Sequence, residues 1–331
     1  MRLLKYVLSL RGLAMVAIVT VACVLSSRYS QHHEFKKGEP AFKTLYMHVV
    51  PAVLVKPPAM SQDSSGNAHV EHATALLEVP LPKALAFMDY RGETHSAEPK
   101  TALFNLQIFQ VAAVLMTLVA FAGVPRYLRT GKGDVLTRIA AGFAEWIRDE
   151  MVRPAMGKEL GNKFLPYFLS VFFFILFMNL MGLAPYSATP TASIFVTAAL
   201  ALTTFMAMLV CGMAVQGPIA FWKNLVPHVP AVLWPLMFVV EVVGLLVKPF
   251  ALTIRLFANM TGGHMVVLSF IGLVFFLGEM WGAAGAWGAA PIGIGFAVFI
   301  MIIESFVALL QAFIFTQLSI LFVQSSVHPE H

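Results

Sequence analysis

The chain has 331 residues, of which 59% are apolar and 12% are charged, and its formal net charge is +5. Soluble globular domains contain about 25% charged residues. Residues 164–329 contain six charged side chains, so this half of the chain cannot present a water-compatible surface. The composition excludes an ordinary soluble protein and predicts an all-α polytopic membrane protein.

The positive charge does not predict a nucleic-acid partner, because the lysines and arginines form no basic stripe interleaved with aromatic residues. Cys23 and Cys211 both lie in apolar runs, where they offer neither a disulfide framework nor metal-ligand spacing. We therefore expect no nucleic-acid partner, no resident metal and no cofactor.

Residues 1–27 form the first part of the chain and are expected to be a signal peptide or a retained anchor helix. Arg2, Lys5 and Arg11 precede the apolar run 12–25, which is the pattern of both kinds of segment. In either case the basic end stays in the cytoplasm and the following segment crosses the membrane.

Residues 28–101 are polar and are expected to form an extracytoplasmic segment with little regular structure. The segment contains six of the ten histidines. These are His32, His33, His48, His69, His72 and His95. Their spacings match no standard ligand set, so a solvated segment is favoured over a metal site.

The apolar run 102–124 is the first full membrane span. The loop 126–163 that follows contains eight lysines and arginines, which places it in the cytoplasm by the positive-inside rule. Apolar residues recur in this loop at helical spacing and predict an amphipathic helix on the cytoplasmic membrane face. They are Val135, Ile139, Phe143, Trp146, Ile147 and Met151.

Residues 164–183 form an outward span, 185–190 a tight turn and 191–215 a returning span. Two longer apolar segments follow, 231–277 and 292–323. The first would be roughly 70 Å long as a helix, against a hydrocarbon core of about 30 Å. Each therefore requires either an extra crossing or a strong tilt and bend.

Three parts are thus predicted, 1–27, 28–101 and a membrane domain that spans 102–331. It holds about five membrane helices in addition to the N-terminal signal or anchor. Residues 282–291, rich in glycine and alanine, separate the two long segments.

Ionisable residues at membrane depth are costly, and each one suggests a function. Glu241, Lys248 and Arg255 are spaced by seven residues, which places them on one helical face, and Asn259 lies one turn further. Arginine keeps its charge under all ordinary conditions. The alternative, neutralising ion pairs that only stabilise helix packing, does not account for an arginine on this face.

The last two segments run antiparallel. Two residues that lie at the same depth, one on each segment, therefore have residue numbers that add up to the same total. Placing His264 level with Glu304 brings Arg255 level with residue 313, within one turn of Gln311. The sequence therefore predicts an outer pair, His264 and Glu304, a central Arg255, and Glu241 as an inner carboxylate.

The string from Lys248 to Met260, KPFALTIRLFANM, resembles the signature of subunit a of the F-type ATP synthase. The strings at 179–185 and 311–315 resemble other parts of that family, and the string at 105–109 is a weaker match. The resemblance extends over roughly 102–323.

By this resemblance, Arg255 corresponds to the family's essential arginine and Glu241 to its carboxylate on the cytoplasmic side. Asn259 and Gln311 correspond to the polar lining of its channel. Lys248 and Asn179 also lie in the matching strings and are secondary candidates.

Many bacterial members of the family have a carboxylate at the position of His264 and a histidine at the position of Glu304. Here the two are exchanged, as in mitochondrial members. An exchange without loss fits a site that needs one acid and one base at a common depth.

The resemblance implies a stator subunit of the bacterial inner membrane that translocates an ion, with protons favoured over Na⁺. It implies two half-channels formed against the c-ring, and coupling of ion flow to rotation and ATP synthesis. The two long segments would form a steeply tilted two-helix hairpin facing the c-ring. The implied partners are the c-ring, subunit b of the peripheral stalk, the rest of the F1F0 complex and the lipid membrane.

No nucleotide motif occurs in the chain, so nucleotide chemistry would belong to other subunits. A self-contained proton-coupled secondary transporter is the alternative function. It predicts inverted repeats, and the sequence shows no internal repeat. A passive structural subunit of a redox complex would leave Arg255 unexplained.

Overall fold

The computed structural model describes residues 10–30, 51–55, 60–62, 68–70, 75–80, 100–184, 187–226, 230 and 232–327. Several features of the sequence lie outside the described residues. They are residues 1–9, Pro185 of the predicted turn, and His32, His33, His48, His72 and His95. For His69 the backbone alone is described.

Within the described residues, five helices are long and apolar enough to cross a membrane. The long helices are α2 (Leu10–Tyr29), α4 (Asn105–Phe121), α7 (Arg153–Gly182), α8 (Ile194–Gln216) and α10 (Trp234–Val327). The shorter ones are α5 (Val124–Thr130), α6 (Val135–Trp146), the π-helix η2 (Ile147–Val152), the 3₁₀ helix η3 (Pro190–Ala192) and α9 (Pro218–Asn224). The predicted all-α polytopic fold is confirmed, and α10 contains both of the over-long apolar segments.

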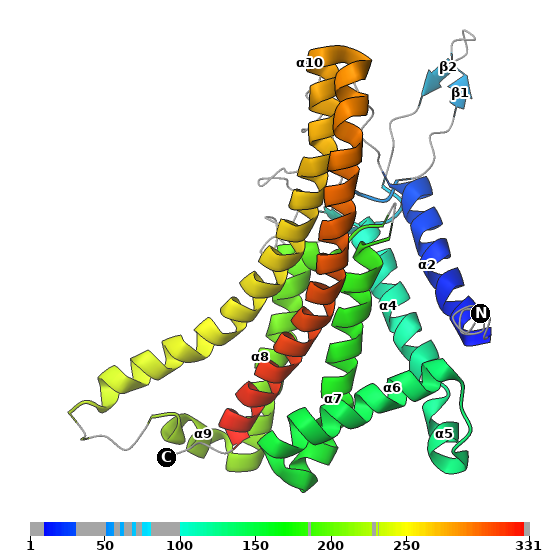
Figure 1. Ribbon diagram of the computed structural model, residues 1–331. Helices are drawn as coiled ribbons and strands as arrows, with labels where there is room; N and C mark the ends of the chain where they lie inside the picture. The colour runs from blue at the N-terminus through cyan, green and yellow to red at the C-terminus, as the bar shows by residue number, and fades with distance from the viewer. Residues whose placement is uncertain are drawn as a thin grey trace.

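α10 is a hairpin with two arms, 234–281 and 283–327 (Figure 1). The helix is interrupted at Gly282, whose φ of 68° and ψ of −159° lie in a region that glycine adopts without a steric penalty. The turn is shorter than the break predicted at 282–291, since residues 283–291 are helical. Alanine, the best helix former, occupies much of this stretch and explains the difference.

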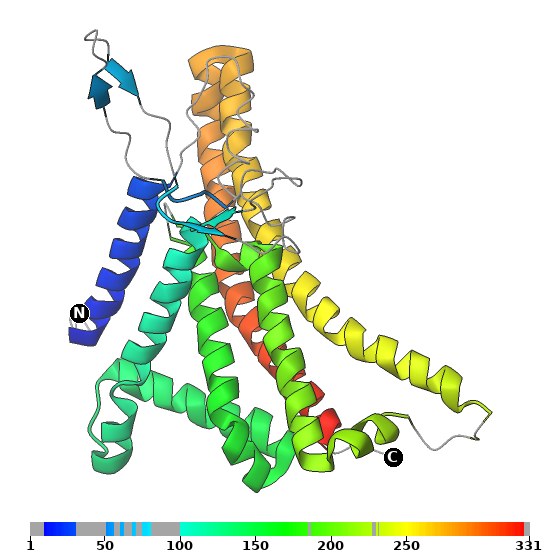
Figure 2. The ribbon, with the colours of Figure 1, turned by 180° about the vertical axis from the view of Figure 1, so that it is seen from behind.

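We call the end of the molecule that carries α5 and α6 the inner end, and the end that carries η3 the outer end. Figures 1 and 2 show that the hairpin extends past the outer ends of α7 and α8. There its arms pack on each other, as the stacked rings of Phe270 and Phe296 show, with centroids 5.0 Å apart. Towards the inner end the first arm diverges from the bundle (Figure 1).

The second arm of α10 packs between α7 and α8, and the apolar core lies at this junction. Phe168, Phe172 and Ile175 of α7 are fully buried, as are Phe315 and Ile320 of the second arm. Large buried side chains of this kind each contribute about 1.5–3 kcal/mol to burial free energy. The second arm is therefore part of the apolar core, and the first arm packs on that core through Leu252, Leu256 and Met260.

α6 and η2 run across the inner end of the bundle, in the loop where an amphipathic helix was predicted (Figure 1). The predicted apolar stripe is divided between two surroundings. Ile147 and Met151 are buried in the protein core, whereas Ile139 and Trp146 are exposed. A surface helix is thus present, and its apolar side is partly covered by the protein itself.

α2 lies along α4, with contacts at both ends. At the inner end Arg11 Nη1 donates to Thr137 Oγ1 of α6 at 2.6 Å. At the outer end the backbone N–H of Val55 donates to the carbonyl of Tyr29 at 2.8 Å. The basic end of α2 therefore lies beside the basic loop, as the predicted common orientation requires.

The predicted extracytoplasmic segment contains two short antiparallel strand pairs. β1 (Met60–Gln62) pairs with β2 (Ala68–Val70), and β3 (Glu78–Pro80) pairs with β4 (Lys100–Ala102). Each strand has three residues, so regular structure in the described part of this segment is limited.

Candidate functional site: a polar axis along the α10 hairpin

Arg255 lies midway along the first arm, and its side chain is exposed. The arm's buried side at this level is formed by Leu252, Leu256 and Met260, and Arg255 lies outside it. Within the described part of the chain, Arg255 makes no hydrogen bond and no ion pair. The guanidinium is therefore available to a group that is not part of this chain.

One turn further out, Asn259 connects the two arms. Its amide Nδ2 donates to Gln311 Oε1 at 2.7 Å. Gln311 is only 2% exposed, so its amide is oriented by the packing of the second arm. The predicted proximity of Asn259 and Gln311, one turn from Arg255, is observed.

His264 and Glu304, which the sequence analysis placed at one level, lie next to each other in the structure. His264 Nδ1 lies 3.5 Å from Glu304 Oε1, and Glu304 is 4% exposed. The other ring nitrogen, Nε2, shares a hydrogen bond with the hydroxyl of Thr189. We call Thr189, His264 and Glu304 the outer cluster.

The outer cluster depends on one glycine in the first arm. A Cβ added to Gly263 would lie 2.7 Å from Glu304 Oε1, closer than nonbonded atoms pack. The neighbouring Gly262 has open space at the same position. Gly263 thus permits the buried carboxyl group to reach His264.

Asn179 also lies at this level, on α7. Its Oδ1 accepts a hydrogen bond from Thr191 Oγ1 at 2.6 Å, and its Nδ2 donates to the carbonyl of Ala308 at 3.3 Å. Asn179 is 1% exposed. It therefore joins α7, η3 and the second arm, and its hydrogen bonds go to neither His264 nor Glu304.

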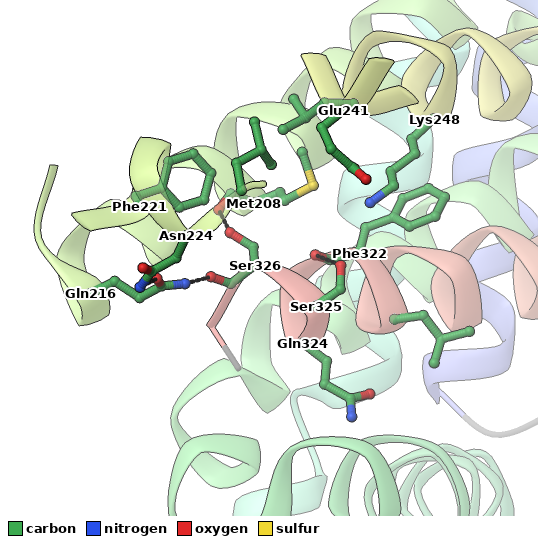
Figure 3. Close-up of a pocket in the computed structure, with 13 residues that line it drawn as sticks. Met208, Gln216, Phe221, Asn224, Glu241, Lys248, Phe322, Gln324, Ser325 and Ser326 are labelled. Carbon is green, nitrogen blue, oxygen red and sulfur yellow. Dashed lines mark hydrogen bonds between the residues drawn. The ribbon is translucent and has the colours of Figure 1, made fainter. Parts of the chain in front are cut away.

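The inner end contains a cavity of about 450 Å³ between the first arm, α8, α9 and the end of the second arm (Figure 3). Glu241 and Lys248 both project towards it, without an ion pair between them (Figure 3). Lys248 Nζ lies 5.5 Å from the centroid of the Phe322 ring. The rest of the polar lining comes from elsewhere in the chain: Gln216, Asn224, Gln324, Ser325 and Ser326.

Two of these lining residues continue the hydrogen bonding around the cavity. Asn224 Nδ2 donates to Gln216 Oε1 at 3.0 Å, and Gln216 Nε2 donates to the carbonyl of Ser326 at 2.6 Å. Neither was selected from the sequence, since each stands alone at the end of an apolar run. The nearby prolines, which mark the inner turn, were the available signal.

Thr189 was also missed, although it lies in the predicted outer turn. The same depth argument that pairs His264 with Glu304 places the outer turn near both, because outward and returning spans end at the outer surface. A polar residue next to Pro190 was thus a candidate. What could not be foreseen is which side of the turn faces the hairpin.

The fold and this arrangement define a class: a polytopic helical membrane protein with an exposed arginine on a long apolar helix, between two groups of polar side chains. A family model described as ATP synthase A chain matches residues 106–324. The chain is 33% identical to ATP synthase subunit a 2 of Chlorobaculum tepidum over 290 residues, covering 84% of this chain and 80% of that protein. The chain therefore belongs to the ATP synthase subunit a family.

Two other relatives bear the same description. ATP synthase subunit a 2 of Prosthecochloris aestuarii is 35% identical over 83% of this chain and 87% of its own length. ATP synthase subunit a of Myxococcus xanthus is 45% identical over 56% of this chain. The aligned part is 59% of the Myxococcus protein, and the chain spans less than two thirds of several of the curated relatives it matches.

Proposed function

We propose that this chain is the ion-translocating stator subunit of an F-type ATP synthase, and that it moves protons through two half-channels formed against a c-ring. The observation that carries the proposal is the position of Arg255. It is exposed on the first arm, between the outer cluster and the inner cavity, without a partner in the described residues.

An unpartnered arginine at membrane depth needs a counter-charge. Placing one at the bilayer centre costs about 2.5–3.5 kcal/mol on insertion scales. A carboxylate carried past the first arm by a ring of c subunits would offset this cost. Conversely, the fixed positive charge favours the ionised form of such a carboxylate, which lipid alone would keep neutral.

The surface around Arg255 fits an apolar partner. Large apolar side chains on both arms are exposed at this level and beyond it. They include Leu246, Val247, Phe250, Ile254, Phe299, Ile302 and Phe306. Exposed apolar side chains in such numbers mark contact with lipid or with another protein, and a helical ring in the membrane meets that description.

The two polar groups are assigned to opposite routes. Protons would enter from the outside past His264 and Glu304, and then along Asn259 and Gln311 to the ring carboxylate. They would leave through the inner cavity beside Glu241 and Lys248. Arg255 separates the routes, so a proton must travel on the ring to pass from one to the other.

The transmembrane potential supplies about 2.3 kcal/mol per charge per 100 mV along this path. Coupling to rotation and ATP synthesis would then rest on the c-ring, subunit b and the rest of the F1F0 complex. A proton is favoured over Na⁺ because an imidazole that faces a carboxyl group is suited to exchange a proton. Binding of Na⁺ would instead call for several oxygen ligands around the ion.

The proposed location is a bacterial inner membrane, with the inner end in the cytoplasm. The basic side chains of α5, α6 and the start of α2 support this orientation. Residues 28–101 would then lie outside the cytoplasm.

Replacing Arg255 with alanine tests the proposal. ATP-driven proton pumping by the complete complex in inverted membrane vesicles should fall to background, because the ring carboxylate loses its fixed counter-charge. Arg129→Ala is the matched control, since Arg129 is an exposed arginine of α5 far from the hairpin. Pumping that survives in the assembled Arg255→Ala complex would refute the assignment.

A further inference from the structure

Thr189 is the residue of the outer cluster that comes from outside the hairpin. It precedes η3 in the turn between α7 and α8, and it is 7% exposed. Its hydroxyl is hydrogen bonded to His264 Nε2. A buried threonine hydroxyl that contacts an ionisable ring inside a membrane protein can determine which ring nitrogen carries the proton.

The turn that carries Thr189 is held from several sides. The carbonyl of Thr189 accepts the backbone N–H of Ala192 at 3.0 Å. Thr191 is bonded to Asn179 of α7, and Thr261 Oγ1 of the first arm donates to the carbonyl of Ala192 at 3.3 Å. The hydroxyl of Thr189 is thereby presented at a fixed place.

Room for that hydroxyl is provided by a glycine at the end of α7. A Cβ added to Gly182 would overlap Thr189 Oγ1. The close approach of α7 to the turn thus requires a residue without a side chain.

The two nitrogens of His264 therefore face different groups. Nε2 is bonded to Thr189, and Nδ1 faces Glu304 Oε1 at 3.5 Å. Glu304 Oε1 is buried and has no hydrogen-bond partner in the described part of the chain. A buried carboxyl oxygen without a partner is costly, and Nδ1 is the polar atom placed to supply one.

We propose that Thr189 is a positioning residue that keeps the proton of His264 on Nε2, so that Nδ1 alone exchanges a proton with Glu304. The threonine oxygen accepts the Nε2–H in both states of the pair. In the transfer the Nδ1–H bond breaks and an O–H bond forms at Oε1. An imidazolium and a carboxylate thereby become a neutral imidazole and a carboxylic acid.

This inference rests on the proposed outer route, and it adds the element that selects the exchanging atom. Without the threonine oxygen, neutral His264 is free to place its proton on Nδ1. Nδ1 then has no lone pair to accept a proton from Glu304. A fraction of the molecules would be in the wrong tautomer at any time, and proton entry would slow in proportion.

The groups that titrate near His264 are few. Glu304 faces it from the second arm, and Arg255 lies nine residues earlier on its own arm. η3 and α8 contain no charged residue, and those of α7 are at its inner end: Arg153, Lys158, Glu159 and Lys163. Among the described residues, the pH profile of proton entry is therefore governed by the His264–Glu304 pair.

The test compares Thr189→Val with Thr189→Ser in the complete complex, by ATP-driven proton pumping in inverted vesicles across a range of pH. Valine keeps the shape and removes the oxygen, and it should reduce pumping about tenfold, the effect of one lost buried hydrogen bond. The valine variant should also show a different dependence of pumping rate on pH. Serine keeps the oxygen and should retain both the rate and the profile.

Thr197→Val is the matched control. Thr197 is fully buried at the start of α8, and its hydroxyl donates to the carbonyls of Ser193 and Ile194. It should pump as the unmodified complex does. Wild-type pumping and pH profile in Thr189→Val would overturn the inference, as would a serine variant as impaired as the valine variant, which would indicate a packing role.

The amount of assembled complex is measured for each variant. If Thr189→Val assembles poorly, Thr189→Ala removes the hydroxyl with less bulk and is read by the same two criteria. Glu304→Gln is measured in parallel. If it is impaired while Thr189→Val is normal, the inference fails and the outer route stands; if Glu304→Gln is itself normal, the outer route of the proposed function fails.

Discussion

The outer cluster and the inner cavity are built in opposite ways. In the outer cluster, Glu304 is 4% exposed and lies against His264, and His264 is hydrogen bonded to Thr189. At the inner end, Glu241 and Lys248 project towards a cavity of about 450 Å³ without forming an ion pair (Figure 3). One polar group is closed by the protein, and the other is open.

The difference follows from what holds the first arm. Near the outer end the arm is packed on the second arm and on the turn before α8, so side chains meet at fixed distances. Towards the inner end it diverges from the bundle (Figure 2). Polar groups in an open cavity can be bridged by water, whereas groups in a closed site depend on their protein partners. Substitutions should therefore have larger effects outside than inside.

The largest effect within this comparison is expected for Glu304→Gln. Glutamine has nearly the same shape, so the helix packing and the amount of assembled complex should be preserved. Proton pumping should fall roughly 100-fold, at the lower end of what a group that gives and takes protons contributes. Normal pumping by a normally assembled complex would contradict the outer route.

A smaller effect is expected for Gly263→Ala. The added Cβ would lie 2.7 Å from Glu304 Oε1 and push the carboxyl group from His264 Nδ1. The displaced carboxyl group should exchange a proton with His264 less readily, so pumping should fall by about tenfold, which corresponds to about 1.4 kcal/mol in the barrier to proton transfer. Gly262→Ala is the matched control, because a Cβ there meets no atom within 4 Å. Equal pumping rates in the two variants would show that the outer cluster tolerates displacement.

The smallest effect is expected for Glu241→Gln at the inner end. The cavity has other polar side chains, Gln216 and Asn224 among them, and is large enough for water. Pumping should stay within about twofold of the unmodified complex, because water supplies what the carboxylate lost. A loss as large as that of Glu304→Gln would mean that the inner end is as closed as the outer end when the complex is assembled.

The polar face of the first arm could be predicted because position along a helix fixes both the face and the level of a side chain. The seven-residue spacing of Glu241, Lys248 and Arg255 needed no other information, whereas the level pairing of His264 with Glu304 was chosen among those that antiparallel segments allow, and the hairpin itself was implied by the resemblance. The depth that this numbering gives agrees with the 3.5 Å separation of His264 and Glu304. Their roles remain proposals.

Prediction failed where the answer depends on rotation and on the packing of distant segments. The apolar stripe of α6 was visible in the sequence, but the burial of Ile147 by the core and the exposure of Ile139 were not. The extent of the hairpin turn was overestimated, because alanine-rich residues after Gly282 continue the helix. The contacts of Thr189 with His264, and of Gly182 with Thr189, join segments whose relative positions could not be read from the sequence.

The sequence by itself determined the membrane class, the apolar length of each segment, the bias of charge between segments and the spacing of the ionisable residues along their helices. These are properties of single segments. The tertiary structure alone decided that Arg255 is exposed without a partner in the described residues, that Glu304 is buried against His264, and that Thr189 reaches that ring. These features depend on how each helix is rotated about its axis and packed on its neighbours. That packing is decided by side chains from distant segments, which come together only in the folded chain.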